Sequence, residues 1–153
     1  MENVRMKITS RFTVAVHTLL VIYIFGKERK TTSDFIAASV RVNPVVIRRT
    51  LLSLKAAGMI DVKAGSGGAT IVKDLHDITL YDVYRAVDSV EGELFHFHEN
   101  PNPACPVGKN IHSVLDNHLA EAQQAMENEL KKVTLADICA ELGEKIKAQA
   151  ALN

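Results

Sequence analysis

The stretch NPVVIRRTLLSLKAAGMIDVKAGSGGATIVK, residues 43–73, joins a helical pattern to a glycine-rich one. Asn43 is a favourable helix N-cap, and Pro44 suits the first helical position. The apolar positions that recur at helical spacing after them are Val46, Ile47, Leu51 and Leu54. Gly58 is typical of a residue that ends a helix. The runs MIDVKA and ATIVK around GSGG then predict a β-hairpin.

The glycines of GSGG leave open a second interpretation, a loop that binds the phosphates of a nucleotide. A P-loop requires a lysine directly after its glycines, and a dinucleotide-binding motif requires a helix there. This sequence has neither, because the strand-like run ATIVK follows. We therefore expect a flexible hairpin tip flanked by Lys63 and Lys73, and no nucleotide-binding enzyme.

A further helix is expected just before this stretch. Thr31 begins the segment TTSDFIAASV, and Asp34 three residues later completes a pattern that resembles a capping box. Only residues 39–43 separate this helix from the next, which is the spacing of a helix-turn-helix motif. A helix-turn-helix followed directly by a hairpin is a winged helix, in which the hairpin lies along the DNA backbone.

Residues 10–25 predict a mostly buried helix, with Ser10 as its N-cap and Gly26 just past its end. The apolar part of this helix, residues 12–25, is shorter than the roughly 20 residues that span a bilayer, and His17 interrupts it. The GKERK that follows offers no signal-peptide cleavage site. We therefore expect a cytoplasmic protein without a membrane partner.

The rest of the chain is expected to be mostly helical. Thr79 and Asp82 repeat the capping pattern before a short helix, and residues 91–107 are loop-like, with three of the four prolines. A long helix is expected over residues 108–132, and Thr134 and Asp137 begin the last one. The predicted fold class is therefore mainly α with a small β-hairpin.

This pattern predicts three parts: a winged helix-turn-helix DNA-binding domain over residues 1–90, a loop over residues 91–107 and dimerisation helices over residues 108–153. The long helix would extend about 37 Å. A winged-helix domain of this size cannot cover an apolar stripe of that length, so the stripe is expected to face a second copy of the chain. The predicted dimer interface consists of Ile111, Leu115, Leu119, Met126 and Leu130.

The formal net charge is zero, but the charges are divided between the two halves of the chain. Residues 1–75 carry twelve Lys/Arg and five Asp/Glu, a net charge of +7, whereas residues 76–153 carry six and thirteen, a net charge of −7. A basic half favours a polyanion as its partner. The two cysteines, Cys105 and Cys139, form no CxxC pair, which excludes a disulfide scaffold and favours a reducing compartment.

Three segments carry a resemblance to a known family: SRFTVAVHTLL (residues 10–20), the run from NPVVIRR to YRAVD (residues 43–88) and CPVGKNIHSVLDNHL (residues 105–119). They resemble the Rrf2 family of bacterial winged-helix transcription regulators. The wing glycines and ITLYDVYRAVD are the most specific parts. The resemblance implies a homodimer built by the long helix and a specific site on double-stranded DNA, expected to be an imperfect palindrome.

The second helix of the helix-turn-helix is expected to place its N-terminal residues at base edges in the major groove. These residues are Asn43, Val45, Arg48 and Arg49. Arginine can bind guanine O6 and N7 bidentately. Because Arg48 and Arg49 point about 100° apart on a helix, we expect one to read a base and the other to bind a phosphate. The alternative is a solvated helix face.

Other DNA contacts are expected outside this helix. At the hairpin, Lys63 flanks the tip, and Ser66 and Gly67 are candidate contacts of the minor groove or the backbone. The resemblance implies backbone contacts by Ser10 and Arg11, at a helix N-terminus that favours phosphate.

The loop before the long helix is the candidate sensor. Family members that carry an iron–sulfur cluster use three closely spaced cysteines there, whereas this chain has only Cys105, so we expect no cluster and no other cofactor. Cys105 precedes Pro106 near a helix N-terminus, a position that lowers a thiol pKa, and Lys109 adds positive potential. A redox-responsive thiol and a buried structural cysteine both remain compatible with this position.

A metal site in the same region is also conceivable. His96, His98, Glu99, Cys105 and His112 are close in sequence. Their spacing matches no recognised zinc motif, and loop histidines are more often solvated. We therefore predict no metal site.

Together these features predict a sequence-specific DNA-binding transcriptional regulator, a repressor that responds to thiol oxidation through Cys105. The alternative is an interaction protein that retains the winged helix but acts by binding a partner protein. An enzyme is not expected, because no nucleophile, base and orienting group occur at a recognisable spacing.

Overall fold

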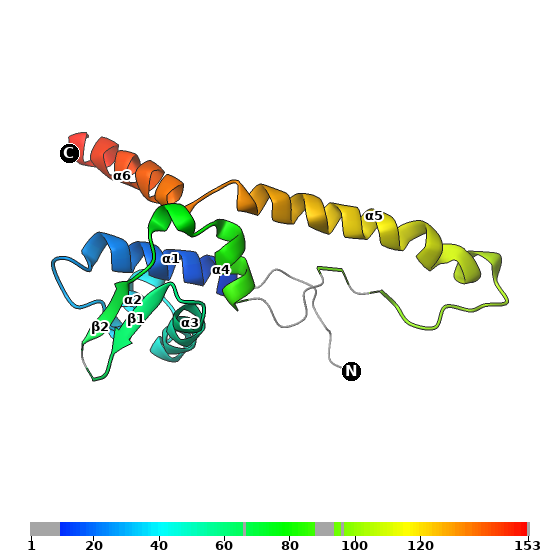
Figure 1. The fold of residues 1–153 in the computed structure, drawn as a ribbon, viewed down its shortest axis with the longest axis horizontal. Helices are drawn as coiled ribbons and strands as arrows, with labels where there is room; N and C mark the ends of the chain where they lie inside the picture. The colour runs from blue at the N-terminus through cyan, green and yellow to red at the C-terminus, as the bar shows by residue number, and fades with distance from the viewer. Residues whose placement is uncertain (1–9, 66, 88–93, 96, 153) are drawn as a thin grey trace.

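The computed structural model describes residues 10–65, 67–87, 94–95 and 97–152, and within them it contains six α-helices, one 3₁₀ helix and one hairpin. The elements are α1 (Ser10–Phe25), α2 (Ser33–Val40), α3 (Pro44–Ala56), β1 (Ile60–Lys63), β2 (Gly68–Ile71), η1 (Leu75–Asp77), α4 (Leu80–Val87), α5 (Pro106–Lys131) and α6 (Leu135–Ala151). Residues 10–87 form a head, α5 extends from it as an arm, and α6 returns across α1 (Figure 1). The predicted fold class is confirmed.

The helices α2 and α3 form the helix-turn-helix motif. Arg41 follows the last residue of α2 and takes a left-handed conformation, with φ 60° and ψ 50°. Asn43 caps α3 as predicted, because its Oδ1 accepts a hydrogen bond from the N–H of Val45 at 2.9 Å, and Pro44 is the first helical residue. The turn between the helices is therefore only residues 41–43.

The start of α2 corrects one prediction. Thr32, and not Thr31, is the N-cap, because Thr32 Oγ1 accepts a hydrogen bond from Phe35 N–H at 3.2 Å. Thr31 is buried and holds the hairpin instead. Its hydroxyl donates to Ala69 O at 2.7 Å, and its carbonyl accepts from Ala69 N–H at 3.0 Å.

The strands β1 and β2 pair antiparallel as the wing, with Ile60 opposite Ile71 and Lys63 opposite Gly68. Gly68 has a φ of 78°, and a Cβ at this position would lie 2.9 Å from the backbone nitrogen of Thr31. Only glycine allows this close approach. The wing is thus held against Thr31, just before the start of α2.

The apolar core joins the helices of the head. Leu51, Ile47 and Leu54 on α3 are buried as predicted, whereas Val46 is 37% exposed. Thr50 is buried in its stead and donates its hydroxyl to Val46 O at 2.9 Å. The large apolar side chains that are fully buried are Leu19, Ile36, Ile47, Leu54, Ile78, Val83 and Leu135.

The helix α6 is fixed to the head at its N-terminus. Thr134 and Asp137 form a capping box there, and Thr79 and Asp82 exchange the same two hydrogen bonds at the start of α4, as predicted for both. Thr79 and Thr134 pair in a β-bridge that joins these two helix starts. Leu135 is fully buried, so the first turn of α6 packs into the core of the head.

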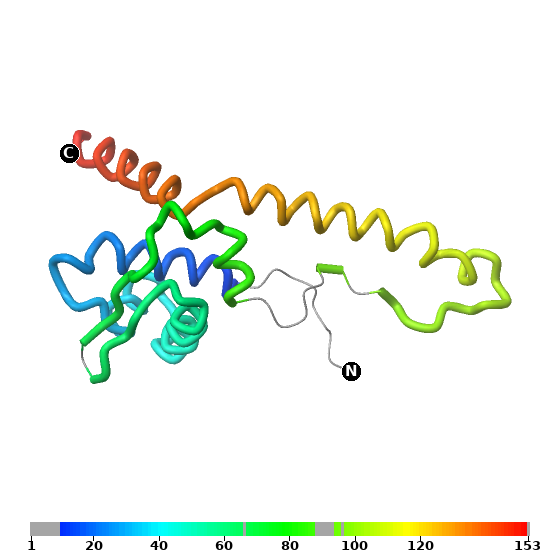
Figure 2. The backbone as a smooth tube through the Cα atoms, in the orientation of Figure 1, coloured from blue at the N-terminus to red at the C-terminus, as the bar shows by residue number. Residues whose placement is uncertain are grey.

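The helix α5 begins at Pro106, two residues before the predicted start, because Pro106 itself occupies its first turn. The trace in Figure 2 shows residues 97–105 leading to the far end of α5, which then runs back toward the head. No side chain described in α5 is buried within this chain. In the described part of the molecule, no helix is long and apolar enough to cross a bilayer.

Candidate nucleic-acid interface

The exposed face of α3 is basic in its N-terminal half. Arg48 and Arg49 are both exposed, and among the described residues neither forms an ion pair or a side-chain hydrogen bond. Val45 is 44% exposed beside them, and Leu52, one turn after Arg48, is 69% exposed. Such an apolar side chain can contact a thymine methyl group. The sequence analysis overlooked Leu52, although its spacing of four from Arg48 indicates the same helix face.

Three further predicted contact residues lie at helix N-termini. Asn43 is exposed, and because its oxygen accepts the capping bond, its side-chain NH₂ keeps two donors for a phosphate or a base. Ser10 and Arg11 are exposed at the start of α1. Ser10 is the first residue of α1 rather than its N-cap, and its carbonyl accepts from the Thr13 hydroxyl at 3.1 Å.

The wing presents Lys63 to solvent at the end of β1. A Cβ at Gly67 would lie 2.3 Å from Lys63 Cβ, so a side chain at this position would displace the lysine. Ser66, the third predicted contact here, lies outside the described residues. The described part of the wing tip therefore combines the exposed cation of Lys63 with the bare backbone of Gly67.

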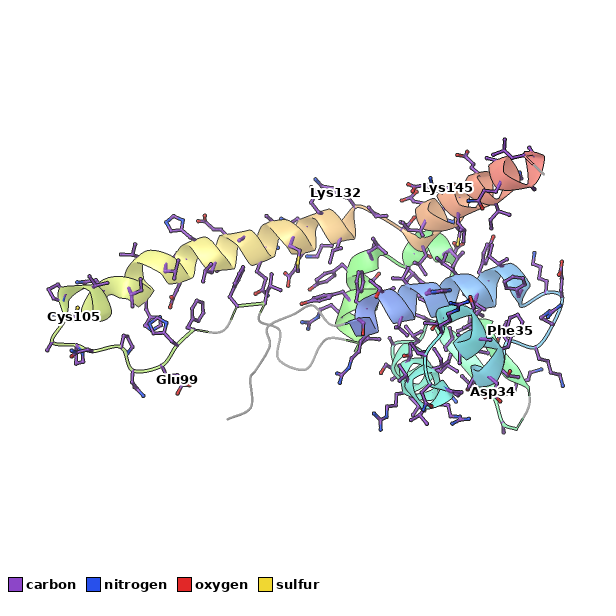
Figure 3. The ribbon with its side chains drawn as sticks, turned by 180° about the vertical axis from the view of Figure 1, so that it is seen from behind. Asp34, Phe35, Glu99, Cys105, Lys132 and Lys145 are labelled. Carbon is purple, nitrogen blue, oxygen red and sulfur yellow. The ribbon has the colours of Figure 1, made fainter. Side chains whose placement is uncertain are left out.

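Cys105 is exposed at the N-cap of α5, at the end of the arm farthest from the head (Figure 3). The nearby backbone N–H groups of Gly108 and Val107, at the start of α5, lower the pKa of its thiol. Cys105 is thus not buried within this chain. Cys139 differs, because it is half-buried and its burial raises the pKa of its thiol.

The candidate metal ligands do not gather into a site. The rings of His98 and His112 are 5.3 Å apart and tilted, and His112 Nδ1 lies 3.1 Å from Asp116 Oδ1. His96 lies outside the described residues. Among the residues that are described, no three His, Cys, Asp or Glu side chains come together in a way that could hold a metal ion.

The residues of the predicted dimer stripe differ in how far their own chain covers them. Leu119 lines a small cavity together with Phe95 and Phe97 from the preceding loop. Ile111, Met126 and Leu130 are half-buried, and Leu115 is 39% exposed. The most exposed apolar side chains of the helix are Val107 at 69% and Val114 at 63%, which the prediction omitted.

A second apolar surface lies on the head, a groove of about 600 Å³ between α1 and α6. Val16 and Leu20 line it from α1, and Leu142 and Ile146 from α6. These residues explain why α1 is more apolar than its contact with the core alone requires.

Comparison with known proteins relates this architecture to a family. Residues 8–141 match the family model Rrf2, described as an iron-dependent transcriptional regulator. YwnA of Bacillus subtilis (strain 168), provisionally named an HTH-type transcriptional regulator, is 50% identical over 131 residues, which cover 86% of this chain and 96% of YwnA.

Two further comparisons agree with the match to this family. YwgB of Bacillus subtilis (strain 168), provisionally named in the same way, is 30% identical over 149 residues, which cover 91% of this chain and 88% of YwgB. A crystal structure provisionally described as a DNA-binding protein is 42% identical, with a TM-score of 0.66, and the match covers 84% of this chain and 98% of that one.

Proposed function

The chain belongs to the Rrf2 family of transcriptional regulators, and from this premise we propose that it binds a specific operator as a homodimer, with α3 in the major groove. One observation carries this proposal. Arg48 and Arg49 are exposed, and among the described residues unpaired, on the helix that follows the three-residue turn. A helix in this position of the motif presents its N-terminal residues to base edges.

The other proposed DNA contacts differ in the chemical groups that they offer. Ser10, Arg11 and Lys63 supply hydroxyl, helix N-terminal and cationic groups that suit phosphates, which position a protein without reading sequence. Gly67 brings bare backbone to the wing tip, and Asn43 keeps two amide donors beside the arginines. Repression requires only that these contacts occupy the operator, so we propose that the protein is a repressor.

The dimer is proposed to use the exposed apolar side of α5. Val107, Val114 and Leu115 project from a helix that buries none of its described side chains. The groove between α1 and α6 is a second apolar surface, which none of the described residues covers. Two identical chains can cover both surfaces at once. Two copies of α3 related by a two-fold axis would then read an imperfect palindrome.

The three-part organisation also remains a proposal. We assign DNA binding to residues 1–90, sensing to residues 91–107 and dimerisation to residues 108–153, with Pro106 and Val107 now shared between the sensor and α5. The family consists of transcriptional regulators and not of enzymes.

We expect operator binding to weaken steeply as salt rises. Each phosphate neutralised by a cation contributes a slope of about −0.9 in a plot of log affinity against log salt. Gel shifts with the DNA upstream of its own gene, between roughly 50 and 200 mM salt, measure the slope. Lys63→Ala should reduce its magnitude by about 1 per subunit, whereas Lys147→Ala on α6 should leave it unchanged.

The same experiment separates the two candidate functions. An interaction protein that acts on a partner protein would bind this DNA weakly or with no preference over unrelated DNA. That result would contradict the proposed function. A salt slope that Lys63→Ala leaves unaltered would contradict the proposed contact between the wing and the DNA.

The sensor is proposed to be the thiolate of Cys105. Hydrogen peroxide oxidises a thiolate to a sulfenic acid and is itself reduced to water, and a second thiol can then displace water to form a disulfide. The description of the family names iron, but the described residues around Cys105 offer one thiolate and no gathered ligands. These described residues do not fit an iron centre, and the proposed sensing uses the thiolate alone.

Oxidation of Cys105 is expected to lower operator affinity reversibly. Added bulk at the N-cap of α5 would tilt the dimer helices, and a small rotation misaligns two α3 helices that must match grooves about 34 Å, or a multiple of that, apart.

Because the pKa of Cys105 is lowered and that of Cys139 is raised, Cys105 should also be alkylated at a lower pH than Cys139, as mass spectrometry can measure.

Two variants test whether Cys105 causes the loss of operator affinity on oxidation. Cys105→Ser should keep its operator affinity in peroxide, and Cys139→Ser should lose it like the unmodified chain, with recovery in dithiothreitol. If Cys105→Ser loses DNA on oxidation as the unmodified chain does, Cys105 is not the sensor.

A further inference from the structure

A cavity of about 680 Å³, here called the basic cleft, lies where the C-terminal end of α1, β2, η1 and the first turns of α6 meet. Its volume is within the range of small-molecule sites, roughly 300–1,000 Å³. None of the residues that line it is a proposed DNA contact. The basic cleft is therefore a separate feature of the head.

The floor of the basic cleft is apolar. Ile22 and Leu75 are buried beneath it, and Ile71 is half-buried. On the α6 side the lining residues include Ala136 and Ala140, whose short side chains leave room between the helix and the head. A surface of this kind can cover the apolar body of a small molecule.

The rim of the basic cleft is cationic. Lys27 and Lys73 line it, are exposed, and form no ion pair among the described residues. Asp74 is the only carboxylate in the lining, and it is already engaged by His76. Its Oδ1 accepts from His76 N–H at 2.9 Å and lies 2.9 Å from His76 Nδ1. The two lysines therefore outnumber the acid.

We propose that the basic cleft binds a small organic anion, with an apolar body of roughly one ring and a carboxylate that the two lysines hold. The groove between α1 and α6 does not suit the same ligand. It has no lysine or arginine in its lining. Of its polar residues, His17 and Ser39 are joined to each other at 2.9 Å, and the Thr13 hydroxyl donates to Ser10 O at 3.1 Å. Of these two cavities, the basic cleft is the one whose lining offers cations to an anion.

The ligand would act as an effector because the basic cleft has walls from two parts of the molecule. Lys73 and Leu75 belong to the head, whereas Ala136 and Ala140 belong to α6. A ligand shifts the angle between two such parts when it fits one arrangement better than another. Binding itself does not depend on the proposed DNA contacts, but the effect on DNA rests on the proposed function.

Phenylacetate is a suitable probe, and phenylacetamide is its neutral counterpart. Titration of the full-length protein, followed by ¹H–¹⁵N spectra, should shift the amides of Lys73, Ala136 and Cys139 with phenylacetate and much less with phenylacetamide. The double variant Lys27→Gln with Lys73→Gln should weaken binding about tenfold, the effect of losing roughly one charge-assisted contact. Ala140→Trp should block the cleft.

The matched control is Lys145→Gln, an exposed lysine of α6 outside the cleft lining (Figure 3), which should bind phenylacetate as the unmodified chain does. Equal binding of phenylacetamide, shifts confined to Val16 and Leu142, or no shifts in the cleft would each overturn the site. In a gel shift, saturating phenylacetate should change operator affinity. Binding in the cleft with unchanged operator affinity overturns the effector role but leaves the proposed DNA contacts intact.

Discussion

Replacement of both Val114 and Leu115 by aspartate is expected to give monomers that lose about 10²–10⁴-fold in operator affinity. These are exposed apolar side chains of α5, at 63% and 39%, so the charges would not disturb the head of a single chain. In a dimer the same positions would lie in an apolar contact, where an unpaired carboxylate is strongly unfavourable. Loss of the second α3 removes the gain in effective concentration that joins two half-sites.

Light scattering measures the oligomeric state, and gel shifts with one and two half-sites measure the affinity. Ser113→Asp with Gln124→Asp is the matched control, because it adds the same charge at exposed polar positions of the same helix. Leu119 is less suitable for this test, since it lines a cavity with Phe95 and Phe97 of its own chain. Dimers that persist in the Val114 and Leu115 variant would contradict the interface.

Local signals in the sequence predicted most of the fold. A cap depends on residues within one turn, so Asn43 before Pro44, and Thr134 with Asp137, were found correctly. The wrong cap at the start of α2 shows the limit of such signals. Thr31 and Thr32 are adjacent threonines, and the local sequence favours either of them equally as the N-cap. The Thr31 hydroxyl donates to Ala69 of the wing, so Thr32 caps the helix.

The part of the candidate site that lies on a single helix, α3, could be predicted from the sequence. Arg48 and Arg49 follow from their position in the helix-turn-helix alone. The side chains of α5 were harder, because its pattern of apolar positions does not say which of them the loop before it covers. Leu119 faces that loop, whereas Val107 and Val114 face solvent.

The basic cleft could not have been predicted from the sequence. Lys27, Lys73 and Ala140 come from segments far apart in the chain, and no one of these segments has a pattern that indicates a ligand. Their meeting depends on the buried Leu135 and the β-bridge between Thr79 and Thr134, which set where α6 returns to the head. Contacts of this range become visible only in the folded chain.

Arg48→Ala and Arg49→Ala are expected to weaken operator binding in different ways. Both side chains are exposed, and among the described residues unpaired, but they point about 100° apart on α3, so they cannot approach the same group of the DNA. Replacement of the arginine that reads a base should reduce the binding free energy by about 1–3 kcal/mol per half-site and relax specificity at one position. The arginine that binds a phosphate should weaken binding to all sequences alike and reduce the salt slope.

Lysine replacements separate the two roles more sharply than alanine. Lysine keeps the charge but loses the bidentate fork, so the base-reading position should lose specificity in the lysine variant while the phosphate-binding position keeps most of its affinity. Competition gel shifts against operators with single substitutions measure both. Lys55→Ala is the control, because Lys55 is an exposed cation at the other end of α3, 3.9 Å from Asp61. If neither arginine variant changes affinity or specificity, α3 is not the recognition helix.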